Sequence, residues 1–187
     1  MAPQRKRLLY FMAAPCLFLL AFWGASLAAR FHPPLLSHGM LPRSLPHLYS
    51  LFTSPFIQNS LFSLFTQSLL FLLLWGLCFA LKSPSSWLLL PCLALGQGLL
   101  QWLLAPSAFY LGPGGLLAAL YSYLLFLSLS RKEIWLFLAS LPFWLFFGHL
   151  VQIVEPQLSG HWLGFMSSML PGLLVQRCLG NFKTQTD

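Results

Sequence analysis

The sequence predicts an all-α membrane protein, a bundle of six transmembrane helices, and three observations predict this fold class. Of the 187 residues, 58% are hydrophobic and only 7% are charged, and the mean hydropathy is +0.76. A soluble domain typically carries about 25% charged residues. Six stretches are apolar enough for membrane helices, and most basic residues stand beside them. The composition therefore excludes a water-soluble monomer and an intrinsically disordered chain.

The six apolar stretches define the expected elements in order. A helix needs about 20 mainly apolar residues to cross the bilayer core, and a spanning segment must satisfy its backbone hydrogen bonds internally. The expected helices are 8–29, 60–81, 87–105, 114–129, 134–154 and 161–179. The chain thus divides into a cytoplasmic N-terminus (1–7), a membrane domain (8–180) with a long exoplasmic loop (30–59), and a cytoplasmic tail (181–187).

The distribution of basic residues predicts the orientation of the chain. With an even number of spans, one side of the membrane receives only Arg30 and Arg43, and the other receives Arg5, Lys6, Arg7, Lys82, Arg131, Lys132, Arg177 and Lys183. Cytoplasmic loops carry the excess of Lys and Arg, so we expect both termini in the cytoplasm. The compact six-span form favours a bacterial inner membrane over an organelle membrane. The same placement of charge argues against a nucleic-acid surface, despite the net charge of +7.

The first apolar stretch shares two features with a signal peptide, a basic start and the small-residue sequence Ser26-Leu27-Ala28. Its apolar run, however, is about 22 residues long, whereas the apolar region of a signal peptide has about 7 to 15. We therefore expect this stretch to be retained as a membrane helix.

The long loop 30–59 contains four prolines, which argue against one regular helix through it. Short helical pieces lying at the membrane interface would suit its apolar residues Leu48, Tyr49, Leu51 and Phe52. We expect an ordered, partly membrane-embedded loop.

Polar residues inside spans are candidates for function, because hydrocarbon penalises them. The second span contains Ser63 and Gln67, four residues apart on one helical face, and Gln58 precedes it. The third span contains Gly96, Gln97, Gly98 and Gln101. For the glycines and serines in the spans, close helix packing is the simpler explanation. The four cysteines form no CxxC pair, so we expect neither a metal site nor a cofactor.

Three stretches together resemble the rhomboid family of intramembrane serine proteases. Residues 51–67 are similar to the segment that leads into the family's second helix. Gly112-Pro113-Gly114-Gly115 is similar to the G-x-S-G turn that opens the fourth helix, and Gly160-His161-Trp162-Leu163-Gly164 to the His-x-x-Gly of the sixth. The resemblance covers residues 8–179 and implies a rhomboid-like six-helix bundle. It also implies a substrate-binding cavity at Gly112, Pro113 and Gly115, open to the exoplasmic side.

The sequence departs from the family at most catalytic positions. The nucleophilic serine falls on Gly114, and the oxyanion-hole positions fall on Ser63, Gln67 and Gln58. Only the general-base histidine is retained, as His161. Glycine offers no nucleophile, which closes the usual acyl-enzyme route, and an oxyanion donor is worth about 10²–10³ in rate. An engineered inactive mutant would explain Gly114 alone, whereas the additional changes indicate natural loss of catalysis.

The resemblance therefore implies a catalytically inactive rhomboid-like protein whose partners are the lipid bilayer and the transmembrane helices of client proteins. One alternative is a protease with an altered active site, using Ser107, Ser122 or Ser63 with His161. Another is a small transporter or channel component, although no Asp, Glu, Lys or Arg lies in the middle of a span. We expect the fourth span to be short and central, packed through Gly114, Gly115, Ala118 and Ala119.

Overall fold

The computed structural model describes residues 2–80, 86–105, 107, 109–135, 138, 141, 142, 145, 174 and 175, with side chains for all of these except 2–11 and 86–88. All the elements assigned in this part of the chain are helices, which confirms the all-α class there. The expected spans 134–154 and 161–179, and with them His161, lie outside the described residues apart from isolated positions. The count of six spans stays a prediction.

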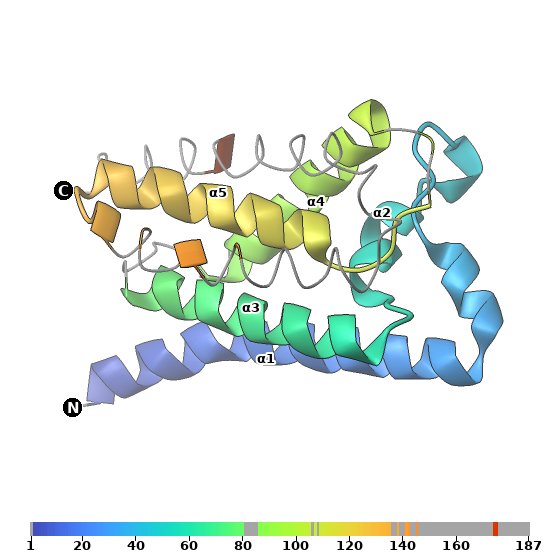
Figure 1. Ribbon diagram of the computed structural model, residues 1–187. Helices are drawn as coiled ribbons and strands as arrows, with labels where there is room; N and C mark the ends of the chain where they lie inside the picture. The colour runs from blue at the N-terminus through green and yellow to red at the C-terminus, as the bar shows by residue number, and fades with distance from the viewer. Residues whose placement is uncertain are drawn as a thin grey trace.

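Four long helices form the described bundle: α1 (Ala2–Phe31), α3 (Leu61–Ala80), α4 (Ser86–Leu104) and α5 (Gly114–Ser130). Their bounds follow the first four expected spans closely, except that α1 begins earlier. Two segments, Met12–Phe31 and Leu61–Ala80, are long and apolar enough to cross a membrane, and Leu89–Leu104 and Gly114–Ser130 are shorter apolar helices. Figure 1 shows α3 lying antiparallel beside α1, with α5 running in the same direction as α3.

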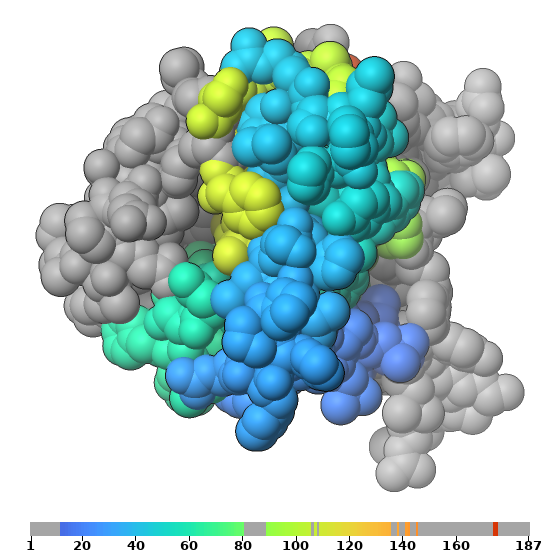
Figure 2. All heavy atoms as spheres, turned by 90° about the vertical axis from the view of Figure 1, so that its right-hand side faces the viewer, coloured from blue at the N-terminus to red at the C-terminus, as the bar shows by residue number. Residues whose placement is uncertain are grey.

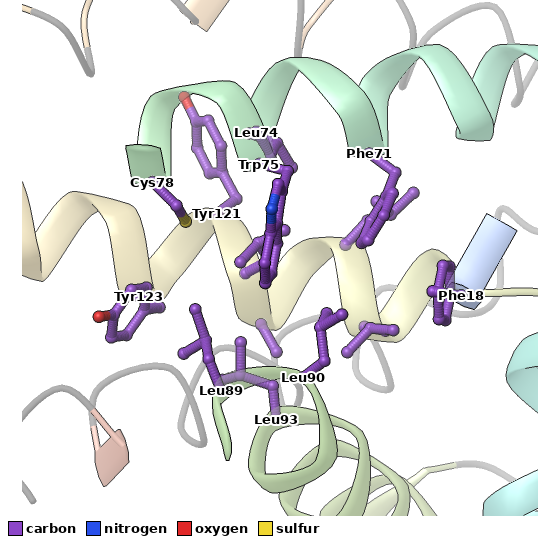
Figure 3. Close-up of a cluster of buried hydrophobic side chains, with 14 of the residues drawn as sticks. Phe18, Phe71, Leu74, Trp75, Cys78, Leu89, Leu90, Leu93, Tyr121 and Tyr123 are labelled. Atoms are coloured by element: carbon purple, nitrogen blue, oxygen red, sulfur yellow. The ribbon is translucent and has the colours of Figure 1, made fainter. Parts of the chain in front are cut away.

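The core lies where α3, α4 and α5 meet. The helix α3 contributes Phe71, Leu74 and Trp75, and α4 contributes Leu89 and Leu93 from the other side of α5 (Figure 3). All five side chains are buried. Phe18 brings α1 to this cluster, with its ring centroid 4.6 Å from that of Phe71. Between α1 and α3, the Trp23 indole N–H donates to the Ser68 hydroxyl over 3.0 Å. A polar contact of this kind adds modest stability between membrane helices.

The helix α5 is central, as expected, because it is apolar on every side and packs against both α3 and α4. It has 17 residues, which corresponds to a length of about 26 Å. Its C-terminal end is closed by Lys132, which has a φ of 59°. There the Lys132 N–H donates to the Leu129 carbonyl, and the Glu133 N–H donates to the Ser128 carbonyl. This pattern is a Schellman motif, which satisfies the last carbonyls of a helix.

The long loop folds into the expected short helical pieces: η1 (Pro33–His38), η2 (Leu45–His47), α2 (Ser50–Thr53) and η3 (Ser54–Phe56). They gather at the end of the bundle where α1 ends and α3 and α5 begin (Figure 1). Leu48, Tyr49 and Phe52 are exposed, as an interfacial position requires. The expectation for Leu51 was wrong, because its side chain is buried and packs against Gly98 of α4.

Backbone contacts fix the loop to the connection between α4 and α5. Met40 and Tyr110 form an antiparallel bridge, with both N–H···O distances 2.9 Å. Burial raises the pKa of Tyr110. Arg43 donates from its backbone to the Trp102 carbonyl over 3.1 Å and from its guanidinium to the Ala105 carbonyl over 3.4 Å. A cation at this place also complements the negative end of the α4 dipole.

Candidate functional site

The candidate site is built around the turn that opens α5. Gly112 has a φ of +85°, a backbone conformation that favours glycine. Its N–H donates to the Ser54 carbonyl of η3 over 2.9 Å, which ties the turn to the long loop. Pro113 then occupies the N-cap position, and its fixed φ suits the start of a helix. The first hydrogen bond of α5 follows, from the Leu117 N–H to the Pro113 carbonyl over 2.8 Å.

Two glutamine side chains lie directly against this turn. A Cβ atom built on Gly112 would stand 3.3 Å from both amide atoms of Gln58 and 3.3 Å from the Oε1 of Gln67. Gln58 is 4% exposed and Gln67 is 8% exposed, so both amides are withdrawn from solvent. The structure thus places Gln58, Gln67 and Gly112 together, although 45 or more residues separate the turn from either glutamine. The absence of a side chain at Gly112 makes room for the two amides.

The carbonyl oxygen of Gln67 has no hydrogen-bond partner among the described residues. A buried polar atom without a partner costs about 1–3 kcal/mol, so such atoms are rare and call for an explanation. This acceptor lies beside the N-terminal end of α5, where the helix dipole and the first N–H groups create a positive potential. The site therefore combines an unpaired hydrogen-bond acceptor, the Gln67 oxygen, with the N–H donors at the start of α5.

Ser26 of α1 holds the Gln58 side of the site. Its hydroxyl donates to the Phe56 carbonyl over 3.2 Å and accepts from the Gln58 N–H over 3.1 Å. Ser26 is 1% exposed, so both bonds are shielded from water. Reasoning from the sequence missed this role. The available signal was a small polar residue near the end of an otherwise apolar helix.

A second pair of buried glutamines supports the turn from α4. Gln97 donates from its amide to the Oε1 of Gln101, one helical turn further along. Both side chains lie against Gly115, where an added Cβ would collide with the amide of Gln97. The sequence marked these residues only as polar members of the third span. The structure brings them to the start of α5.

Gly114, the expected nucleophile position, does not take part in this packing. No described atom lies within 4 Å of a Cβ built there, in contrast to Gly115. Among the described residues, then, α5 packs through Gly115 and not through Gly114, because the two adjacent positions of the helix point in different directions. His161, which the resemblance places opposite Gly114, lies outside the described residues.

The alternative nucleophiles are distributed unevenly around the site. Ser63 is fully buried on α3, one turn before Gln67. Ser107 is exposed and accepts from the Arg43 guanidinium over 3.1 Å. Ser122 is buried two turns into α5, and its hydroxyl donates to the Ala119 carbonyl of the same helix over 2.9 Å. Neither Ser107 nor Ser122 lies at the helix start, where backbone donors converge.

The described part of the site is built from neutral amides and the start of a helix, groups that can bind a polar ligand. Among the described residues, no group of three or more His, Cys, Asp or Glu side chains could hold a metal ion. Comparison with protein-family models, with curated proteins and with solved structures gives no match for this chain. The geometry therefore carries the functional argument.

Proposed function

We propose that this chain is a catalytically inactive, rhomboid-like integral membrane protein that binds transmembrane segments of client proteins. The observation that carries the proposal is the site at Gly112. Two buried glutamines converge there on a left-handed glycine turn, beside a helix start at which no described atom lies within 4 Å of the Gly114 Cβ position. Such a site has hydrogen-bonding capacity for a ligand, while glycine stands where the resemblance places the serine of an acyl-transfer site.

The proposal includes the full membrane arrangement expected from the sequence. It has six spans, both termini in the cytoplasm, and the long loop on the exoplasmic side. The position of the site supports this arrangement, because the turn before α5 lies at the same end of the bundle as the long loop (Figure 1). A client helix would then meet the site near the outer membrane surface.

Site-specific photocrosslinking tests client binding. A photoreactive amino acid at Gly114 should crosslink to transmembrane proteins in native membranes, because no described side chain fills that position. The matched control is the same amino acid at Leu129, which is 52% exposed near the opposite end of α5. Crosslinks at 114 but not at 129 support a client site. Equal crosslinking at both positions would indicate random encounters and contradict the proposal.

A fluorophosphonate labelling assay separates the pseudoprotease from an altered protease. We expect no labelling of the purified, folded protein. Labelling that is lost in His161→Ala would mean that another serine works with His161, and the pseudoprotease proposal would fail. The serine could then be identified by testing Ser63→Ala, Ser107→Ala and Ser122→Ala.

A further inference from the structure

The start of α5 presents two kinds of hydrogen-bonding group side by side. The N–H groups of Gly114 and Gly115 precede the first bond of the helix, and Pro113 supplies no side-chain cap. Next to the turn, Gln67 is nine-tenths buried and its Oε1 has no partner among the described residues. A ligand that fits both must accept from the helix and donate to the glutamine.

This requirement excludes groups that only accept or only donate hydrogen bonds. A carboxylate offers only acceptors, so it would leave the Gln67 oxygen unpaired and bring two electron-rich groups together. An ammonium or guanidinium group offers only donors and would face the positive end of the helix dipole. A carboxamide offers a carbonyl for the helix N–H groups and an NH₂ for the Gln67 oxygen.

Most polar groups of a client's transmembrane helix already have hydrogen-bond partners within that helix. An intact helix pairs its own backbone groups within the membrane. Hydroxyl side chains bond to carbonyls of their own helix, as Thr66 does to Phe62 over 3.0 Å and Ser68 to Leu64 over 2.7 Å. The carboxamide of Asn or Gln carries two donors and an acceptor, and it therefore reaches the site with bonds still to make.

We propose that the Gln67 oxygen and the first N–H groups of α5 form a site for the carboxamide side chain of an Asn or Gln in a client's transmembrane helix. This inference rests on the proposed function and specifies which clients are recognised. The Gln67 oxygen is shielded from solvent in this structure, so a carboxamide reaches it only when the turn before α5 moves aside. Figure 2 shows atoms of the connection between α4 and α5, drawn in yellow, at the surface beside the beginning of α3.

The test measures binding of model helices to the full chain in lipid nanodiscs. Three fluorescent, Leu-rich helices carry Asn, Leu or a Gly-Gly pair at the same position near the outer membrane surface. We expect the Asn helix to bind about three- to thirtyfold more tightly than the Leu helix, the range that interhelical hydrogen bonds give in membranes. The Gly-Gly helix, whose backbone can open locally, should bind like the Leu helix.

Two variants assign the preference to the site. Gln67→Met removes the acceptor and Gly114→Phe fills the open space, and both should abolish the preference for Asn. Thr66→Val is the matched control, because it removes a buried polar group of α3 that is already bonded within its own helix. This variant should keep the preference. Gly114→Phe adds a side chain where no described atom lies within 4 Å of the Cβ position, so it tests the site independently if Gln67→Met folds poorly.

Four results would overturn the inference, and they separate it from the proposed function. Equal binding of the Asn and Leu helices, or a preference that survives both variants, would exclude a carboxamide site while client binding stands. Tight binding of the Gly-Gly helix that depends on Gln67 would show that the site takes backbone amides instead. If no helix binds at all, client binding itself fails together with the inference.

Discussion

At the scale of single residues, the glycines of the turn before α5 have different roles that one sequence motif does not distinguish. Gly112 has a left-handed backbone and makes room for two amides, Gly115 makes room for Gln97, and Gly114 has no described neighbour within 4 Å of its Cβ position. The motif in the sequence identified a glycine-rich turn at the start of a helix. Which glycine is indispensable depends on the atoms that an added Cβ would contact at each position.

Gly112→Ala should lower the free energy of unfolding by about 1–3 kcal/mol. Alanine is strained at a φ of +85°, and its Cβ would press on Gln58 and Gln67. Thermal unfolding in detergent checks this. Gly76→Ala on α3 is the control, because no described atom lies within 4 Å of its Cβ position and alanine favours a helix. Equal melting temperatures for Gly112→Ala and the parent protein would contradict the assigned role.

The neighbouring pair Gly114 and Gly115 gives a second prediction. Gly115→Ala should destabilise the protein by about 1–3 kcal/mol through overpacking against Gln97, whereas Gly114→Ala should change stability by no more than about 0.5 kcal/mol. Both variants are measured in the same unfolding assay. A larger loss of stability for Gly114→Ala than for Gly115→Ala would contradict the packing assigned to these two positions.

At the scale of elements, local composition predicts where the helices run but not how the loop joins them. The apolar stretches end at Phe31, Ala80, Leu104 and Ser130, within two residues of the expected ends. The loop pieces have no such periodic signal. They are positioned by contacts with distant residues, such as Met40 with Tyr110 and Gly112 with Ser54.

Ser26→Ala tests the link between α1 and the start of α3. The change removes the hydroxyl that bonds both Phe56 and Gln58, so the protein should lose about 1–3 kcal/mol of stability. Ser130→Ala is the matched control, since that exposed hydroxyl bonds within its own helix over 2.7 Å. The backbone N–H of Gln58 should also exchange faster with deuterium in Ser26→Ala. Unchanged exchange there would remove Ser26 from the site.

At the scale of the whole molecule, the described helices place the long loop, the turn before α5 and the start of α3 at one end of the bundle (Figure 1). The alternating direction of the helices produces this arrangement. In the sequence, by contrast, most basic residues stand beside the expected helix ends of the other side. The proposed orientation in a membrane rests on that asymmetry.

Single-cysteine labelling with an impermeant maleimide tests the orientation. In a variant whose four native cysteines are replaced by serine or alanine, Ser37→Cys in the exposed η1 should react from outside intact cells. Gln4→Cys and Thr184→Cys should react only after the membrane is opened, because both termini are expected in the cytoplasm. Labelling of Thr184→Cys from outside would indicate an odd number of spans.

The sequence by itself determined the all-α class and the positions of the four long helices, because helix formation in an apolar segment depends on the segment's own residues. Only the tertiary structure decided that Gln58 and Gln67 press against Gly112, that Ser26 bonds the Gln58 backbone, and that no described atom lies close to the Gly114 Cβ position. Each of these facts depends on the relative placement of residues far apart in the chain. Local composition cannot encode that placement, whereas packing around α5 fixes it.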